Sequence, residues 1–180
     1  MRVLAIPGSL SATSSHAALL RAARHVAPPG TEIVVFDGLG GLPHFSPDLD
    51  VEPVPAPVAA LRAQIGAADA LAICSPEYAH GIPGSLKNAL DWLVSALEPI
   101  GKPALVISAS PSGAAFAHAH LLEVARTMMG SYLIDGGAHV FSRAHVDAGG
   151  GITAPPLVAA LATGFARLAE ACAAAAAAAG

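Results

Sequence analysis

The sequence contains few of the residues that build disulfide frameworks, redox motifs or metal centres. Only two cysteines, Cys74 and Cys172, occur among its 180 residues. Both lie in apolar surroundings without a Cys-x-x-Cys or Cys/His spacing, which is typical of reduced core cysteines. The eight histidines are scattered along the chain. We therefore expect neither a disulfide-stabilised fold nor a bound metal.

Charged residues are also few: Asp, Glu, Lys and Arg make up 12% of the sequence, and the formal net charge is −4. Nucleic-acid-binding domains usually carry a basic face, so we expect no nucleic-acid partner. The mean hydropathy is +0.59, yet we find no run of about 18 strongly apolar residues. The stretch before Pro7 is too short for a signal peptide. The composition predicts one soluble, cytoplasmic domain over residues 1–180, without a membrane partner.

Several common phosphate and nucleotide motifs are missing as well. The sequence has no Gly-x-Gly-x-x-Gly fingerprint and no Gly-Lys-Ser/Thr of a P-loop. The loop after the first predicted strand contains no cysteine, which excludes a cysteine-based phosphatase there. That strand is also not followed by the acidic pair of a metal-binding phospho-receiver. No Ser/His/Asp triad or paired-carboxylate site is evident.

Short apolar runs alternate with helical patterns along the chain. Strands are predicted at residues 3–6, 31–36, 70–74, 104–107 and 138–141. Helices are predicted after Ser14 or Ser15, over 58–67, beyond Pro83 with Leu86, Leu90, Leu93 and Leu97 on one face, over 114–129, and from Pro156 onward. This alternation predicts an α/β three-layer sandwich, whose five-stranded parallel sheet has the flavodoxin-like order 2-1-3-4-5. Ligands bind at the carboxyl edge of such sheets.

The first loop at this edge is rich in hydroxyl groups. Residues 9–15 contain four serines and one threonine, and a helix follows. Backbone N–H groups, the helix dipole and the hydroxyls converge there, as in a phosphate-binding loop. The pattern also fits a capped helix whose serines bind only water. The loop alone does not decide between these interpretations.

The most informative stretch is residues 75–93, a loop rich in proline and glycine that leads from a strand into a helix. Composition alone fits an ordinary connection. However, residues 76–78 (Pro-Glu-Tyr), 83–84 (Pro-Gly), 86–89 (Leu-Lys-Asn-Ala) and 91–92 (Asp-Trp) closely resemble the signature of the NAD(P)H-dependent FMN reductase family. That family contains flavodoxin-like quinone, azo-dye and chromate reductases.

The resemblance implies FMN as cofactor and NAD(P)H as electron donor. Ser11 stands where the family has arginine, and His16 and Ala79 stand where it has asparagine, so we expect neutral donors to hold the phosphate. His118 falls where the family often has glutamine, and is either a ligand contact or an ordinary polar-face residue. The resemblance assigns cofactor binding to Ser9, Ser11, Thr13, Ser14, Ser15, His16, Pro76, Glu77, Tyr78, Ala79, His80, Gly81, Ile82, Pro83, Gly84 and Ser110.

The family's chemistry implies a reductase that passes electrons by a ping-pong mechanism to a quinone, an azo compound, a metal oxyanion or free flavin. No side chain is assigned a catalytic role, because the cofactor carries the hydride chemistry. Residues 37–57, rich in Gly and Pro, fit either a solvated connection or the family's loop near its subunit contact, and the family's assembly implies a homodimer or homotetramer. Two alternatives remain: an electron carrier, usually far more acidic than this chain, and a member of the fold that does not bind flavin.

Overall fold

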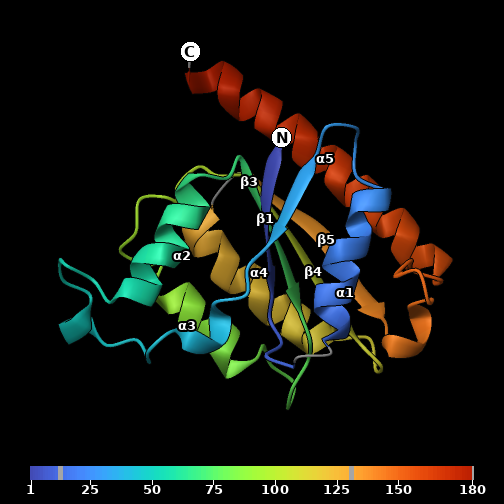
Figure 1. Ribbon diagram of the computed structural model, residues 1–180, viewed down its shortest axis with the longest axis horizontal. Helices are drawn as coiled ribbons and strands as arrows, with labels where there is room; N and C mark the ends of the chain where they lie inside the picture. The colour runs from blue at the N-terminus through green and yellow to red at the C-terminus, as the bar shows by residue number, and fades with distance from the viewer. Residues whose placement is uncertain (12–13, 130–131, 180) are drawn as a thin grey trace.

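A sheet of five parallel strands forms the centre of the molecule (Figure 1). In this computed structural model, which describes residues 1–11, 14–129 and 132–179, the strands pair in the order β2-β1-β3-β4-β5. Every pairing is parallel. The predicted flavodoxin-like order is therefore confirmed. The strands are β1 (Arg2–Pro7), β2 (Glu32–Val35), β3 (Ala70–Ser75), β4 (Ala104–Ser110) and β5 (Leu133–Val140).

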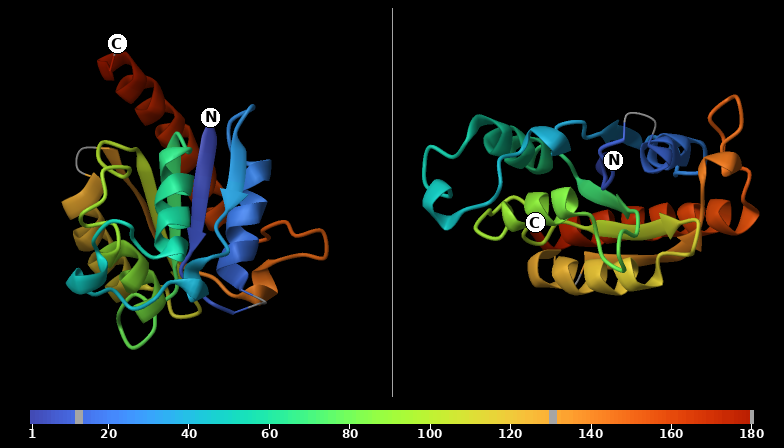
Figure 2. Two further views of the ribbon diagram at one scale, coloured as in Figure 1. Left: turned by 60° about the vertical axis from the view of Figure 1, so that its left-hand side comes forward. Right: turned by 90° about the horizontal axis from the view of Figure 1, so that it is seen from below.

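Helices cover both faces of this sheet (Figure 1 and Figure 2). On one face pack α2 (Ala56–Gly66), α3 (Gly84–Asp91) and α4 (Ala115–Met129). On the other pack α1 (Ser15–Ala22) and α5 (Pro155–Ala179). The predicted three-layer sandwich is thus confirmed. Short 3-10 turns are η1 (Ala23–His25), η2 (Leu39–Gly41), η3 (Pro47–Leu49) and η5 (Arg143–His145).

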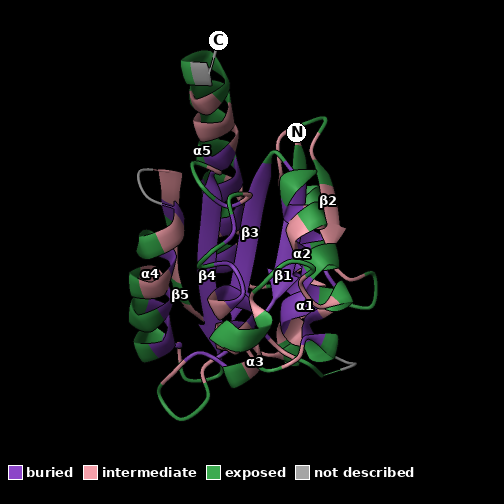
Figure 3. Cartoon of the chain, turned by 90° about the vertical axis from the view of Figure 1, so that its left-hand side faces the viewer, coloured by how far each residue is buried: buried purple, intermediate pink, exposed green. Residues whose placement is uncertain are grey.

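Alternation along the strands produces two hydrophobic cores. In β1, Leu4 and Ile6 face α2, α3 and α4, whereas Val3 and Ala5 face α1 and α5. The strands β3 and β4 repeat this pattern, and both are buried along their whole length (Figure 3). Burial on both faces explains why these strands read as continuous apolar runs in the sequence. Cys74 belongs to the second core, where burial raises the pKa of its thiol to about 12.

The helix α3 is shorter than its leucine spacing predicted. It ends at Asp91, and the side chain of Leu97 is 78% exposed. At this end the Arg62 guanidinium donates to the carbonyl oxygen of Trp92, at 3.2 Å from Nε and 2.7 Å from Nη2. The last carbonyl groups of a helix have no hydrogen-bond donor within the helix, and here Arg62 supplies a donor to one of them. Apolar spacing carries no sign of such a partner.

The strand β5 is longer than predicted. The prediction began at residue 138 because Gly136 and Gly137 interrupt the strand-forming residues before it. A Cβ atom at Gly136 would lie 2.6 Å from Cγ1 of Ile107 and 2.8 Å from the carbonyl oxygen of Val106. Glycine is thus required where β5 approaches β4 at an irregular register. Strand propensity alone would place a break at this position.

The last helix extends past the sheet (Figure 1). By length and composition, Pro155–Ala178 could cross a membrane, which differs from our expectation that no such apolar run occurs. However, Leu157, Leu161, Phe165 and Leu168 on α5 are buried against the sheet, as in a core helix of an α/β layer. The alanine tract continues this helix to Ala179.

Candidate functional site

Loops that follow β1, β3 and β4 meet at the carboxyl edge of the sheet, as predicted. Together with the segment after β5 they line a cleft of about 200 Å³. Six of the predicted site residues lie together there: Ser15, His16, Pro76, Glu77, Tyr78 and Ser110.

The hydroxyl-rich loop forms the beginning of α1. Ser14 is the N-cap, and its Oγ accepts the N–H of Ala17 at 3.3 Å. The Ser9 Oγ accepts the N–H of Ser11 at 3.3 Å. Thr13 lies outside the described residues. The loop is thus pre-shaped by its own hydroxyl groups, and beside them lie the N–H groups of the first helical turn, which have no carbonyl partner within the helix.

A cation also lies at this loop. Ser9, Ser11 and Ser14 line a cavity of about 290 Å³ that Arg21 lines as well. Arg21 follows Ser14 by about two turns of α1, at 3.6 residues per turn, and so lies on the same side of the helix. A positive charge therefore lies near this loop, and the prediction that neutral donors hold the phosphate stays a prediction.

The loop after β3 turns back on itself as a tight hairpin. Tyr78 and Gly81 exchange two backbone hydrogen bonds of 3.0 Å. Ala79 and His80 form its tip with φ angles of +49° and +60°. Two positive φ angles are characteristic of a type I′ turn, which favours Asn-Gly. Compared with the asparagine of the family's pattern, Ala79 is therefore less suited to the backbone conformation of this turn, and it also lacks any contact that the asparagine side chain would make.

Replacing Ala79 by asparagine should stabilise the protein by about 0.5–1 kcal/mol. The left-handed conformation costs an ordinary L-residue about 1–2 kcal/mol, and asparagine tolerates it better. Urea unfolding of the parent and the variant measures the difference. Ala79→Val should destabilise, because a β-branched side chain disfavours positive φ. If the asparagine variant unfolded at lower urea concentration than the parent, the turn would not be strained.

Two side chains fasten this loop to its surroundings. The Glu77 Oε2 accepts the backbone N–H of Ala117 at 2.9 Å, so a carboxylate occupies the N-terminus of α4, where the helix dipole favours it. The Tyr78 hydroxyl lies 3.4 Å from the Ser9 Oγ and joins the β3 loop to the β1 loop. At the rim, the His80 ring stacks on Phe116 with centroids 4.3 Å apart.

The remaining predicted residues of this loop do not line the cleft. Ala79, His80 and Gly81 form the hairpin end, and Ile82 is buried in the core beneath α3. Pro83 is the N-cap of α3 and Gly84 is its first residue. These six positions shape the loop, whereas residues 76–78 face the cleft.

His118 is buried away from the cleft. Its Nδ1 lies 3.1 Å from the Ser108 Oγ, and its Nε2 lies 2.8 Å from Oδ1 of Asp135. The ring thereby connects α4 to β4 and β5. Although partial burial opposes ionisation, hydrogen bonds from His118 and from the Gly137 N–H hold the pKa of Asp135 below its ordinary value.

His16 connects the β1 loop to β4. Its Nε2 lies 2.7 Å from the carbonyl oxygen of Ala109, and the residue is only 8% exposed. Burial lowers the pKa of His16, and the hydrogen bond to Ala109 opposes this shift in part. The neutral ring, donating from Nε2, is thus favoured. An asparagine here, as in the family's pattern, could donate but could not be protonated.

This burial should make stability depend on pH. Because the folded-state pKa of His16 lies below 6.5, the unfolded chain takes up a proton first as the pH falls. Stability is therefore lost below a pH of about 6.5, down to the folded-state pKa. We expect Tm to fall more between pH 7.5 and 5.5 in the parent than in His16→Asn, as measured by scanning calorimetry. Equal falls in both proteins would contradict this assignment.

Five residues of the cleft were not among the predicted ones. Phe141, Ser142 and Arg143 follow β5 and line the cleft together with the β3 loop residues, as do Ala109 and Pro111 at the end of β4. Ser142 precedes η5, where its backbone N–H donates to Nδ1 of His145 at 3.0 Å. The predicted parallel order could have identified them, because the end of β5 lies at the same edge as the other loops.

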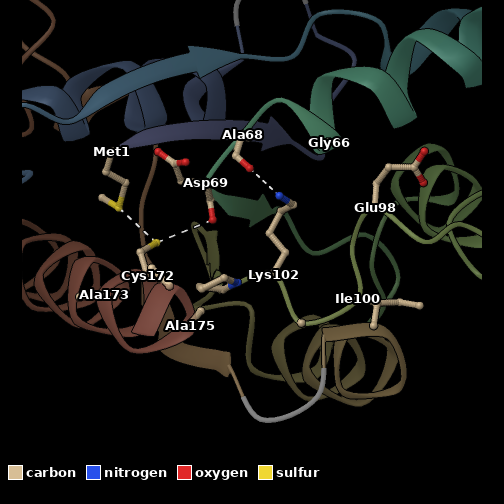
Figure 4. A pocket seen from close by; sticks show the side chains of 13 residues that line it. Met1, Gly66, Ala68, Asp69, Glu98, Ile100, Lys102, Cys172, Ala173 and Ala175 are labelled. Carbon is tan, nitrogen blue, oxygen red and sulfur yellow. Dashed lines mark hydrogen bonds between the residues drawn. The ribbon is translucent and has the colours of Figure 1, made fainter. Parts of the chain in front are cut away.

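A larger cavity, of about 600 Å³, lies at the opposite edge of the sheet (Figure 4). Met1, Asp69 and Lys102, at the amino ends of strands, line it together with Cys172 of α5. The Lys102 Nζ donates to the carbonyl oxygen of Ala68, and the Cys172 Sγ lies 3.5 Å from Sδ of Met1. In open parallel sheets, ligands bind at the carboxyl ends of the strands. Size alone therefore does not identify this cavity as the functional site.

Known proteins resemble the chain in sequence and in structure. The family model described as NADPH-dependent FMN reductase matches residues 1–146. An NAD(P)H-dependent FMN reductase of Pseudomonas aeruginosa is 40% identical over 125 residues, which are 67% of either chain. A quinone reductase of Escherichia coli is 35% identical over 130 residues, 69% of either chain.

Among solved structures, the chain is similar to FerB, a flavoenzyme NAD(P)H:(acceptor) oxidoreductase from Paracoccus denitrificans. The TM-score is 0.78 at 27% sequence identity, over 94% of this chain and 97% of FerB. The predicted resemblance is therefore confirmed. The chain belongs to the NADPH-dependent FMN reductase family and is an oxidoreductase with FMN as cofactor and NAD(P)H as electron donor.

Proposed function

We propose that this enzyme reduces quinones by a ping-pong mechanism, and that azo compounds, metal oxyanions and free flavin are further acceptors. The observation that carries the proposal is the cleft in which the hydroxyl-rich β1 loop meets residues 76–78. Relatives whose names state FMN reductase or quinone reductase support it.

The residues around the cleft fit FMN. The N–H groups of the first turn of α1 and the hydroxyls of Ser9, Ser11 and Ser14 suit a phosphate group. Arg21 beside them supplies a positive charge. Pro76, Pro111 and Phe141 offer apolar surface to a flat ring, and Ser110 offers a polar edge. When bound, FMN supplies the hydride and electron-transfer chemistry.

The chain's own side chains hold the walls of the cleft in place. Tyr78 and Ser9 connect the β3 and β1 loops, His16 connects the β1 loop to β4, and Glu77 connects the β3 loop to α4. The β1 and β3 loops are thereby fixed to each other and to β4 and α4 before any ligand arrives. Such preorganisation lowers the cost of ordering on binding.

The ping-pong proposal rests on a single cleft that serves both substrates. The oxidised product NAD(P)⁺ must leave after hydride transfer before a quinone can enter, so double-reciprocal plots at several fixed NADPH concentrations should be parallel. Intersecting lines would contradict this order.

The cofactor site has its own test. FMN added to apoprotein should lose fluorescence at micromolar concentrations, and absence of quenching would contradict the cofactor site. A carrier would bind FMN but would not oxidise NAD(P)H.

We also propose a homodimer or homotetramer in the cytoplasm, without nucleic-acid or membrane partners. Four large apolar side chains lie exposed on or beside the loops of the cleft, each between 56% and 61% accessible. They are Leu10, Tyr78, Phe116 and Val140. A second copy that covered them would give the cleft an opposite wall. Light scattering at working concentration tests this assembly, and a monomer would contradict it.

A further inference from the structure

Three arginines converge on a pocket beside the flavin cleft. Arg21 and Arg24 come from α1 and η1, and Arg143 comes from η5. They line a cavity of about 430 Å³ that also includes Ser14 and Asp147. The segment after β5 lies next to α1 in both views of the ribbon (Figure 1 and Figure 2). We call this cavity the arginine pocket.

The arginine pocket carries an excess of positive charge in a chain whose net charge is −4. Among the described residues, Arg21 and Arg24 form no ion pair with a carboxylate. The Asp147 carboxylate lines the pocket too, but it accepts the N–H of Gly151 at 2.7 Å within its own turn. Cations gathered in a concave surface repel one another, and a bound anion relieves that repulsion.

The arginine pocket is continuous with the site already described. Ser14 and Arg21 also line the cavity of the hydroxyl-rich loop, and Arg143 also lines the flavin cleft. A ligand in either place could therefore reach the arginine pocket along the surface. The Gly-rich residues 147–151, a linker by their sequence, form part of its wall.

We propose that the arginine pocket is a subsite for a phosphate group of an adenine dinucleotide whose other end occupies the flavin cleft. This inference rests on the proposed function. The guanidinium fork matches phosphate oxygens in a bidentate geometry. Two sources share this chemistry. One is the 2′-phosphate of NADPH, which NADH lacks, and the other is the second phosphate of FAD, which FMN lacks.

The test uses Arg24→Gln, because Arg24 lines the arginine pocket but neither of the two adjoining cavities. Arg126→Gln is the matched control: it removes the same charge from an exposed position on α4, across the sheet. Oxidised, FMN-loaded protein is titrated with NADP⁺ and NAD⁺ by calorimetry, and apoprotein is titrated with FAD and FMN.

If NADPH is the source, Arg24→Gln should raise the Kd for NADP⁺ about 10-fold, the loss of one charge-assisted hydrogen bond. The Kd for NAD⁺ and FMN should stay unchanged, as should all values in Arg126→Gln. If FAD is the source, only the Kd for FAD should rise, and the subsite still stands. Raising the ionic strength should weaken the binding of NADP⁺ more than that of NAD⁺ in the first case, and the binding of FAD more than that of FMN in the second.

The proposal is overturned if neither NADP⁺ nor FAD responds to Arg24→Gln by more than about 2-fold. It is also overturned if NAD⁺ binding weakens as much as NADP⁺ binding, because Arg24 would then act on a group that both dinucleotides share and not on the 2′-phosphate. A parent protein that fails to bind FMN would instead refute the flavin site. The two failures are therefore distinguishable.

Discussion

Replacing Ser14 by alanine should weaken FMN binding about 10- to 150-fold. A hydrogen bond to a charged group is worth roughly 1.5–3 kcal/mol, which converts to this range of Kd. The same hydroxyl also accepts the N–H of Ala17 as N-cap, so its loss leaves the start of α1 less well formed. Fluorescence quenching of FMN by apoprotein gives the dissociation constants.

Two further variants separate the two roles of Ser14. Ser14→Asn keeps both a capping oxygen and an N–H donor, so its loss of affinity should be smaller. Ser46 caps η3 in the same way, accepting the N–H of Asp48 at 3.3 Å, but lies in the loop after β2. Ser46→Ala should therefore leave FMN affinity unchanged. A folded Ser14→Ala protein with parental affinity would show that the phosphate lies elsewhere.

Ser11→Arg should strengthen FMN binding, because it restores the cation of the family's pattern. Since Arg21 and Arg143 line the adjoining cavities, we expect FMN affinity to fall measurably as salt increases. The local sequence alone predicts only a weak dependence on salt, because no cation lies between Gly8 and Leu20. The cations come from further along α1 and from the other end of the chain.

The order of the strands and the edge that carries the site could be predicted from the sequence. Alternating strands and helices admit few parallel arrangements, and the carboxyl ends of the strands then meet at one edge. The contacts that fix the loops could not be predicted in the same way. His16 meets Ala109 and Glu77 meets Ala117 only after the strands have paired, and such contacts leave no local pattern.

The motif on α3 is a second example. By its spacing from Leu86 and Leu90, Asn88 falls off the apolar face of its helix, which predicts an exposed, polar position. In the structure it binds the long loop after β2: its Oδ1 accepts the N–H of Phe45 at 2.7 Å, and its Nδ2 donates to the carbonyl oxygen of Pro43 at 2.9 Å. Trp92, about one turn later, donates to the same carbonyl from Nε1 at 2.8 Å. Residues 43–45 are therefore held in place and are not simply solvated.

Trp92→Ala should destabilise the protein by about 3–5 kcal/mol. Truncating a buried tryptophan leaves a large cavity and removes its transfer free energy, and Trp92 is fully buried. It also removes the edge contact with Phe45, whose ring centroid lies 5.2 Å away. Urea unfolding measures the free energy, and hydrogen exchange should show early loss of protection at Phe45.

Trp92→Phe and Leu97→Ala make this test specific. Phenylalanine keeps much of the buried volume and loses the Nε1 donor, and Asn88 still satisfies the Pro43 carbonyl, so this variant should cost only about 1–2 kcal/mol. Leu97 is an exposed apolar residue, and its truncation should change stability by about 0.5 kcal/mol or less. If Trp92→Ala cost no more than Leu97→Ala, the long loop would not depend on Trp92. The aspartate–tryptophan end of the motif would then need an explanation other than anchoring residues 43–45.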